Sequence, residues 1–135
     1  MRILVDTNVL VRSVERRHPL MRPSRQASKI LYQQGHELCA TTQNIAEFWN
    51  VSTRPAAQNG LGNNIPALFA VLPDSMEAFR EWRRLVLLHA VQGTKVHAAR
   101  LVAIMKVHHI RQILTFNGGD FKRFPAIAIL DPTRI

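Results

Sequence analysis

The sequence predicts a three-layer α/β/α fold built on a central, mainly parallel sheet of about five strands. Short apolar runs rich in valine, isoleucine and leucine alternate along the chain with longer segments of helical spacing. Such alternation favours parallel strands whose connecting helices cover both faces of the sheet. The chain has 135 residues, of which 47% are hydrophobic, and this suits one domain spanning residues 1–135 with a buried core.

The first predicted unit is a strand followed by two helices. Residues 2–5 form an aliphatic run, which predicts a buried strand with Asp6 at its carboxyl end. Residues 8–14 then show helical spacing. After a break at two prolines, Ser24 is expected to cap a helix of residues 24–34 that a glycine ends.

The second predicted unit follows directly. Residues 37–41 predict a strand, and Thr42 is expected to cap a helix of residues 43–53 that carries Trp49 on its apolar face. A proline stops this helix. Residues 56–66 contain two glycines and three asparagines, which predicts an exposed loop.

The third strand is predicted at residues 69–72, where a proline ends it. Asp74 or Ser75 is expected to cap the next helix, residues 76–91. The apolar stripe predicted for this helix consists of Phe79, Trp82, Val86 and Ala90.

The last part of the chain begins with a helix predicted at residues 95–108, after a glycine and a threonine. Its inward-facing residues are expected to be Leu101, Val102 and Met105. Residues 112–115 predict a fourth strand, residues 117–120 a turn, and residues 127–130 a fifth strand.

The charge balance indicates a partner that carries phosphate or carboxylate groups. Eighteen basic residues against nine acidic ones give a net charge of +9, and 14 of the basic residues are arginine. Because guanidinium groups bind phosphate through paired hydrogen bonds, the charge favours nucleic acid, with an acidic protein partner as the alternative. No apolar run suits a membrane span or a secretory signal, and the one cysteine, Cys39, fits a reducing cytoplasm.

Three of the nine acids are predicted to converge at one edge of the sheet. Asp6 follows the first strand, Asp120 lies in the turn after the fourth strand, and Glu47 lies in the helix after the second strand. Ligands of open parallel sheets bind at the carboxyl ends of the strands. Carboxylates gathered there repel one another without a cation, and Mg²⁺ or Mn²⁺ takes oxygen ligands. Such a site activates water for attack on a phosphodiester.

Each of these acids also has a structural alternative. Asp6 suits a helix cap, Asp120 a turn, and Glu47 a solvated helix surface. The hypothesis of a metal site therefore depends on the three occurring together. Zinc, phosphate-loop and serine-nucleophile sites lack their motifs. His97 is expected to be a surface residue, with contact to a site from the start of its helix as the alternative. A phosphoacceptor domain that uses Asp6 is a further alternative.

Five stretches in order carry a family resemblance. They are residues 3–10 (ILVDTNVL), 46–55 (AEFWNVSTRP), 59–62 (NGLG), 93–103 (GTKVHAARLVA) and 114–124 (LTFNGGDFKRF). Together they resemble the PIN domain, specifically its VapC-like toxin members, which are paired with small antitoxins. The resemblance implies an Mg²⁺- or Mn²⁺-dependent ribonuclease whose partners are RNA, a cognate antitoxin and a second copy of the chain in a homodimer.

The resemblance also implies roles for individual residues. The acidic metal ligands and catalytic residues would be Asp6, Glu47 and Asp120. The residues that support the site through hydrogen bonds would be Thr7, Asn8, Thr115 and Asn117. The basic residues expected to contact the substrate are Arg12, Lys95, Arg100 and Lys122.

The chain departs from the family pattern at two places. Ala98 stands where the pattern has an acid, so the site lacks one negative charge and one oxygen ligand, and we expect weak or no activity. The alanine is a natural loss, a deliberate substitution, or a sign that another group takes the role. Residues 63–68 are too few for a helix that the family usually has there. The alternative function is a non-catalytic PIN-like module that binds RNA or an antitoxin peptide.

Overall fold

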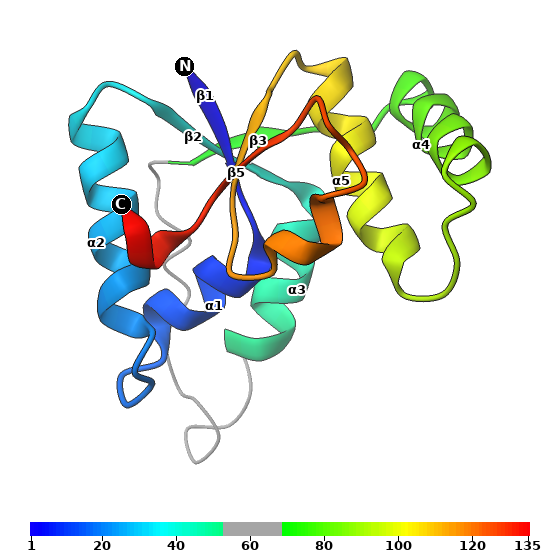
Figure 1. Ribbon diagram of the computed structural model, residues 1–135. Helices are drawn as coiled ribbons and strands as arrows, with labels where there is room; N and C mark the ends of the chain where they lie inside the picture. Colours follow the sequence, from blue (N-terminus) through cyan, green and yellow to red (C-terminus); the bar gives the residue numbers. More distant parts are fainter. Residues whose placement is uncertain (53–68) are drawn as a thin grey trace.

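The computed structural model describes residues 1–52 and 69–135 (Figure 1). The loop expected at residues 56–66 and the shortened segment at residues 63–68 lie outside the described residues. No helix in the described ranges is long and apolar enough to cross a membrane.

The sheet confirms the predicted fold class. In the described part of the chain it has five strands, all paired in parallel, in the order β3-β2-β1-β4-β5. The strands are β1 (Arg2–Val5), β2 (Glu37–Thr41), β3 (Ala70–Leu72), β4 (Gln112–Leu114) and β5 (Ala128–Leu130). The strand positions agree with the sequence-based prediction to within one residue at each end.

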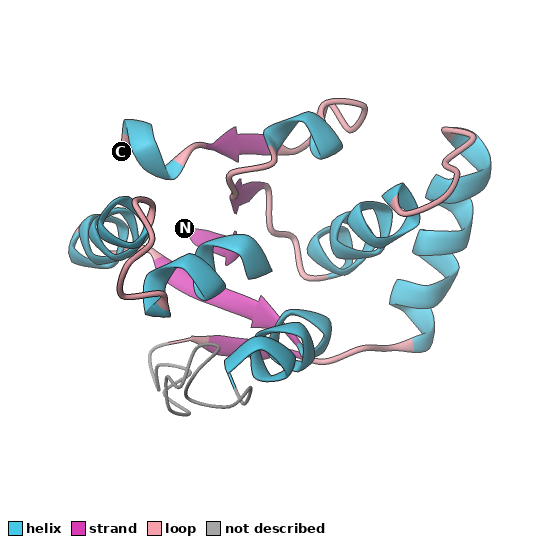
Figure 2. Cartoon of the chain, turned by 90° about the horizontal axis from the view of Figure 1, so that it is seen from below, coloured by secondary structure: helices cyan, strands magenta, loops and turns pink. Residues whose placement is uncertain are grey.

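Helices cover both faces of the sheet, as Figure 2 shows from below. One face carries α1 (Thr7–Val14), α2 (Met21–Gln33) and α3 (Thr42–Ser52). The other face carries α4 (Met76–Leu88) and α5 (Lys95–Val107), which pack against each other. Two short 3₁₀ helices, η1 (Gly118–Phe121) and η2 (Pro132–Arg134), flank β5 in the sequence.

Strand side chains alternate between two hydrophobic cores. In β1, Leu4 belongs to the core under α4 and α5, whereas Ile3 and Val5 belong to the core under α1, α2 and α3. All three are fully buried. Since successive side chains of a strand point to opposite faces, a continuous apolar run is what a sheet covered on both sides requires.

The start of α2 differs from the prediction. The helix begins at Met21, so Ser24 lies inside it and is not its N-cap. The Ser24 hydroxyl instead donates to the carbonyl of Leu20 at 2.8 Å. Pro23 lies in the first turn, where a helix tolerates proline because its missing N–H would have no partner there.

The start of α3 also uses a different cap from the one expected. The Thr41 hydroxyl accepts from the Asn44 backbone N–H at 3.1 Å, and the Asn44 side chain accepts from the Thr41 N–H at 3.0 Å. These reciprocal bonds resemble a capping box. Thr42, the expected cap, donates to Asp74 instead. Trp49 is 53% exposed, so its predicted place on the apolar face is wrong.

The buried stripe of α4 agrees with the prediction only in part. Trp82 and Val86 pack against the core and are partly buried, as predicted, whereas Phe79 is 44% exposed. The fully buried residues of the helix are Ala78 and Leu85. Ser75 caps the helix as predicted, accepting from the Ala78 N–H at 3.0 Å. The helix ends at Leu88, earlier than expected.

The α5 prediction is confirmed at Leu101, Val102 and Met105, all of which are buried. Four further residues of α5 are also buried, so it is the central helix of its face.

Candidate active site

A cleft of about 320 Å³ opens beyond the carboxyl ends of the strands, where α1, α3, α5 and η1 meet. Its lining includes all three predicted acids, Asp6, Glu47 and Asp120. Three of the four predicted supporting residues, Thr7, Asn8 and Asn117, also line it. The sheet topology therefore brings together side chains that are far apart in the sequence.

Asp6 is held on both carboxylate oxygens by its own chain. Oδ1 accepts from the Thr7 backbone N–H at 2.7 Å, which caps α1. Oδ2 accepts from the hydroxyl of Thr115 at 2.8 Å and from the side-chain amide of Asn8 at 3.3 Å. Asn8 is fixed in turn, since its Oδ1 accepts from the Phe116 N–H at 3.2 Å. Asp6 is therefore a helix cap and a cleft residue at the same time.

The remaining predicted supporting residues complete this network. Thr115, which is buried, accepts from the Asn117 backbone N–H at 3.0 Å. The Thr7 hydroxyl accepts from the Asn44 side chain at 2.9 Å, and this bond links the network to α3. The donors on Asp6 thus come from both ends of the chain.

The environment of Asp6 raises its pKa above the usual 3.8. Burial is the main cause, because a desolvated carboxylate resists ionisation. Hydrogen bonds from Thr115 and Thr7 act in the opposite direction, while the negative charges of Glu47 and Asp120 raise the pKa further. The three acids therefore repel one another electrostatically, which is the situation that a bound cation relieves.

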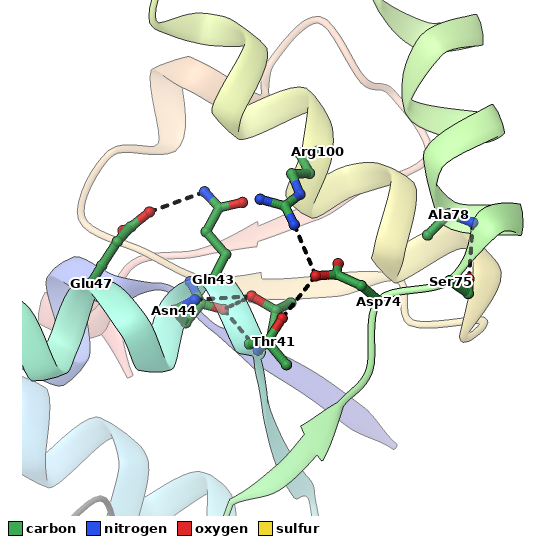
Figure 3. Close-up of polar contacts among 9 residues, drawn as sticks. Thr41, Gln43, Asn44, Glu47, Asp74, Ser75, Ala78 and Arg100 are labelled. Carbon is green, nitrogen blue, oxygen red and sulfur yellow. Dashed lines mark hydrogen bonds and ion pairs between the residues drawn. The ribbon is translucent and has the colours of Figure 1, made fainter.

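Glu47 lies on the exposed face of α3. One side chain holds it, since the Gln43 amide donates to Glu47 Oε1 at 3.0 Å (Figure 3). Gln43 lies one helical turn earlier and also lines the cleft. The side-chain oxygen of Gln43, Oε1, is buried and has no hydrogen-bond partner among the described residues.

Asp120 lies in η1 and is paired with Lys95 at the start of α5, with Nζ 3.3 Å from Oδ1. The position of η1 depends on Gly118, because a Cβ there would lie 2.8 Å from Cγ2 of Ile129 in β5. A side chain at residue 118 would therefore force η1 or Ile129 to shift, and η1 is the element that carries Asp120.

The donor set fits a hard divalent cation, because the cleft offers carboxylate oxygens that carry mutually repelling charges. The three carboxylates do not, however, lie close together. Among the described residues, no three His, Cys, Asp or Glu side chains are grouped closely enough to hold one ion. Glu47 and Asp120 are instead engaged by Gln43 and Lys95.

Ala98 lies on the cleft wall, on α5, and is 9% exposed. An acid at residue 98 would therefore have faced Asp6 and the other carboxylates across the cleft. The preceding residue, His97, also lines the cleft. His97 is exposed, as expected, and it also lines the cleft that holds the three acids.

The basic residues predicted to contact the substrate are mostly paired with acids of the chain. Arg12 lines the cleft and donates to both carboxylate oxygens of Glu15, at 2.8 and 2.9 Å. Lys95 pairs with Asp120, as described above. Lys122, at the end of η1, is exposed.

Arg100 does not line the cleft, and it binds an acid that follows β3. Its guanidinium group binds Asp74 at 2.8 Å, and Asp74 also accepts from Thr42 (Figure 3). The guanidinium carbon lies 6.0 Å from the ring centre of Trp82. Two side chains, Thr42 of α3 and Trp82 of α4, therefore hold the Arg100–Asp74 pair in place.

Sequence patterns alone did not identify Gln43 as a cleft residue. Gln43 is four residues before Glu47, which is a signal for contact on a helix surface. His97 was expected at the surface, with contact to a site as the alternative, and its place at the start of a helix and beside the position of the missing acid are the sequence features that mark it.

The sequence model of the PIN domain matches residues 3–127 of the chain. No curated protein sequence matches it. The fold is similar to that of VapBC2 from Rickettsia felis, bound to a DNA fragment from its promoter. That similarity has a TM-score of 0.74 and 13% identity, and covers 97% of this chain and 98% of the other.

Two further solved structures share the fold. One is FitAcB from Neisseria gonorrhoeae, with a TM-score of 0.71, 21% identity, and coverage of 98% of this chain and 99% of the other. The second is VapC20 from Mycobacterium tuberculosis, described as a toxin that cleaves the sarcin–ricin loop. Its TM-score is 0.67, with 13% identity and coverage of 90% of this chain and 95% of the other.

Proposed function

The chain belongs to the PIN domain family, and from this premise we propose that it is an Mg²⁺- or Mn²⁺-dependent endoribonuclease of the VapC toxin type. PIN domains of VapC toxins are generally nucleases, and PIN nucleases generally use divalent metal ions. The cleavage of the sarcin–ricin loop by a structurally similar toxin supports RNA as the substrate class.

One observation carries the proposal: Asp6, Glu47 and Asp120 line the same cleft, and the charges of the latter two raise the pKa of Asp6. The cleft lies where ligands of open parallel sheets bind. A net charge of +9 supplies the attraction for a polyanion.

Different residues of the chain would bind the ion, orient Asp6 and contact the RNA. Asp6, Glu47 and Asp120 would hold the ion, which when bound neutralises phosphate charge and activates water for attack. Thr115 and Asn8 fix the orientation of Asp6 through their hydrogen bonds to Oδ2. Arg12 and Lys122 are the basic residues that would hold the RNA backbone close to the cleft.

We expect the activity to be weak, because Ala98 contributes no ligand to the cleft wall. Lys95 adds to this effect, since its ammonium group neutralises part of the charge of Asp120. Both features lower the negative potential that attracts a cation.

A single-turnover assay tests the proposal. The protein in excess is incubated with end-labelled RNA in Mn²⁺, in Mg²⁺ and in EDTA. We expect slow cleavage that EDTA abolishes, and an increase on the order of 10- to 100-fold in Ala98→Asp. No cleavage in Ala98→Asp, with the fold intact by circular dichroism, would contradict the proposal.

The second candidate is a non-catalytic module that binds RNA or an antitoxin peptide. Two observations favour it: the three acids are not gathered in the described structure, and Lys95 occupies Asp120. Filter binding of the same RNA discriminates between the two functions. Affinity without metal-dependent cleavage, in both the wild type and Ala98→Asp, supports the module.

The proposed partners are RNA, a cognate antitoxin and a second copy of the chain. The antitoxin is supported by the solved toxin–antitoxin complexes that share the fold. A salt titration tests the RNA contact, because phosphate binding weakens steeply as salt rises. Light scattering on the purified chain tests the homodimer, and a monomeric mass would refute it.

A further inference from the structure

We propose that His97 is a metal ligand of the cleft, and that its imidazole makes the site favour a first-row transition ion such as Mn²⁺ or Co²⁺ over Mg²⁺. The inference rests on the proposed function, since it concerns the same ion. It assigns a nitrogen ligand to a site for which the sequence predicts carboxylates alone.

The placement of His97 is the first support. It is the third residue of α5, and it lines the cleft together with Asp6, Glu47 and Asp120. The helix cannot rotate to move it away, because the following residues, Ala98 and Ala99, are buried against the core. His97 itself is exposed, so its ring is free to turn about its two side-chain torsions.

The second support is that nothing in the described structure engages the imidazole. His97 makes a backbone bond to Thr94, but no hydrogen bond, ion pair or ring contact occupies its side chain in the described residues. Other histidines are used structurally. His18 accepts from the Leu20 N–H at 3.0 Å, and His89 packs against the ring of Phe124.

The third support is the chemistry of the cleft wall. Ala98 offers no donor, so α5 contributes a ligand to the cleft only through the adjacent imidazole. Among the described residues of the lining, His97 is the only one with a nitrogen that metals favour. Imidazole suits transition ions, whereas Mg²⁺ prefers oxygen and gives up its waters reluctantly. The loss of an acid therefore changes the kind of ion that the cleft selects.

Ion binding requires two side chains to change partners. The carboxylate of Glu47 must leave Gln43, and that of Asp120 must leave Lys95. Both contacts are exposed, and such contacts are weak. The ion can therefore gather these side chains without disturbing the core.

The test is a calorimetric titration of the wild type and His97→Ala with Co²⁺, Mn²⁺ and Mg²⁺, together with the visible spectrum of bound Co²⁺. We expect His97→Ala to weaken Co²⁺ binding by about 10-fold or more, and Mg²⁺ binding by less than about 3-fold. The Co²⁺ absorption band should shift, because a nitrogen ligand is lost. The matched control is His109→Asn at the far end of α5, where φ is 58° and asparagine is tolerated.

Unchanged Co²⁺ affinity and spectrum in His97→Ala would overturn the inference, as would an equal loss in His109→Asn. Asp6→Asn separates this failure from failure of the proposed function. If Asp6→Asn abolishes Co²⁺ binding while His97→Ala does not, the carboxylate site stands and the His97 inference falls. If neither variant changes binding, the metal site itself is wrong. Thermal unfolding of each variant confirms that the fold is intact.

Discussion

The two sides of the cleft are built differently. On the β1 side, Asp6 accepts three hydrogen bonds, and Thr115 beneath it is 1% exposed. On the opposite side, Glu47 and Asp120 are each held by one exposed contact, to Gln43 and to Lys95.

The difference separates fixed geometry from adjustable geometry. The β1 side keeps its arrangement whether or not an ion is present, because its donors are backbone groups and packed side chains. The opposite side can exchange its weak internal contacts for an ion. Variants on the β1 side should therefore lower stability, or lower activity and ion binding together, whereas variants on the opposite side should change ion affinity with little change in stability.

The largest effect is expected from Asp6→Asn, which removes the fixed ligand. Cleavage should fall by about 100- to 1000-fold, as is usual when an electrostatic group of an active site is lost. Single-turnover rates in Mn²⁺ measure this. Asp131→Asn is the matched control, since Asp131 also caps a helix but lies outside the cleft. Equal rates in the wild type and Asp6→Asn would refute the fixed-ligand role.

Thr115→Val tests the support beneath Asp6. The variant keeps the shape but removes the hydroxyl, so that Asp6 loses a donor and the Asn117 N–H loses its acceptor. The free energy of unfolding should fall by about 1–3 kcal/mol. Urea denaturation measures it, and Thr115→Ser, which keeps the hydroxyl, should lose less. An unchanged free energy of unfolding in Thr115→Val would show that this network does not fix the β1 side.

The ionisation of Asp6 should have a smaller effect, which is a loss of stability as the pH rises. Because the folded pKa of Asp6 is raised, the folded state keeps this proton to higher pH than the unfolded state does. The contribution of Asp6 to the unfolding free energy is complete below its unfolded pKa of 3.8. It is then lost as the pH rises through the folded pKa.

Urea denaturation of the wild type and Asp6→Asn, at pH values that start about one unit below the unfolded pKa and rise to neutral, measures this contribution. The stability of the wild type relative to Asp6→Asn should decline as the pH rises. If the stability difference between the two proteins instead increases with pH, the hydrogen bonds to Asp6 lower its pKa by more than burial raises it. Added Mn²⁺ should restore part of the loss at neutral pH, because an ion that binds only the folded state stabilises it.

The smallest effect is expected from Lys95→Ala on the adjustable side. Its exposed ion pair contributes at most about 1 kcal/mol, so stability should change little. Ion affinity should rise by a few-fold, roughly 2- to 5-fold, because Asp120 no longer has a competing cation. Lys106→Ala is the matched control, since Lys106 lies at the other end of α5 and pairs with Glu81. A loss of ion affinity in Lys95→Ala would contradict the view that Lys95 competes with the ion for Asp120.

The fold was predictable because strand and helix signals alternate along the whole chain. The sequence predicted only part of the buried face of α4. Trp82 and Val86 pack against the core as expected, but the packing against α5 decides whether Ala78 or its neighbour Phe79 faces inward. It also misplaced the caps of α2 and α3, where a serine and a threonine were expected to serve the helix. Their hydroxyls instead donate to Leu20 and Asp74.

The candidate site was predictable where residues directly follow strands. Asp6 follows β1, and Asp120 follows β4 after a short turn, so both lie at the predicted edge. Gln43 was missed, and contact of His97 with the site was only the alternative, because their positions depend on how α3 and α5 are placed across the cleft. The partners of Arg12 and Arg100 were missed for the same reason.

The contact between Gly118 and Ile129 makes the place of Asp120 depend on the strand register of β5. Side chains alternate along a strand, so a slip of β5 by one residue would turn Ile129 to the other face of the sheet. The surface on which η1 rests would then be gone, although no residue of the cleft had changed. The alignment of β5 with β4 is thus one of the conditions that keep the carboxylate of Asp120 in the cleft.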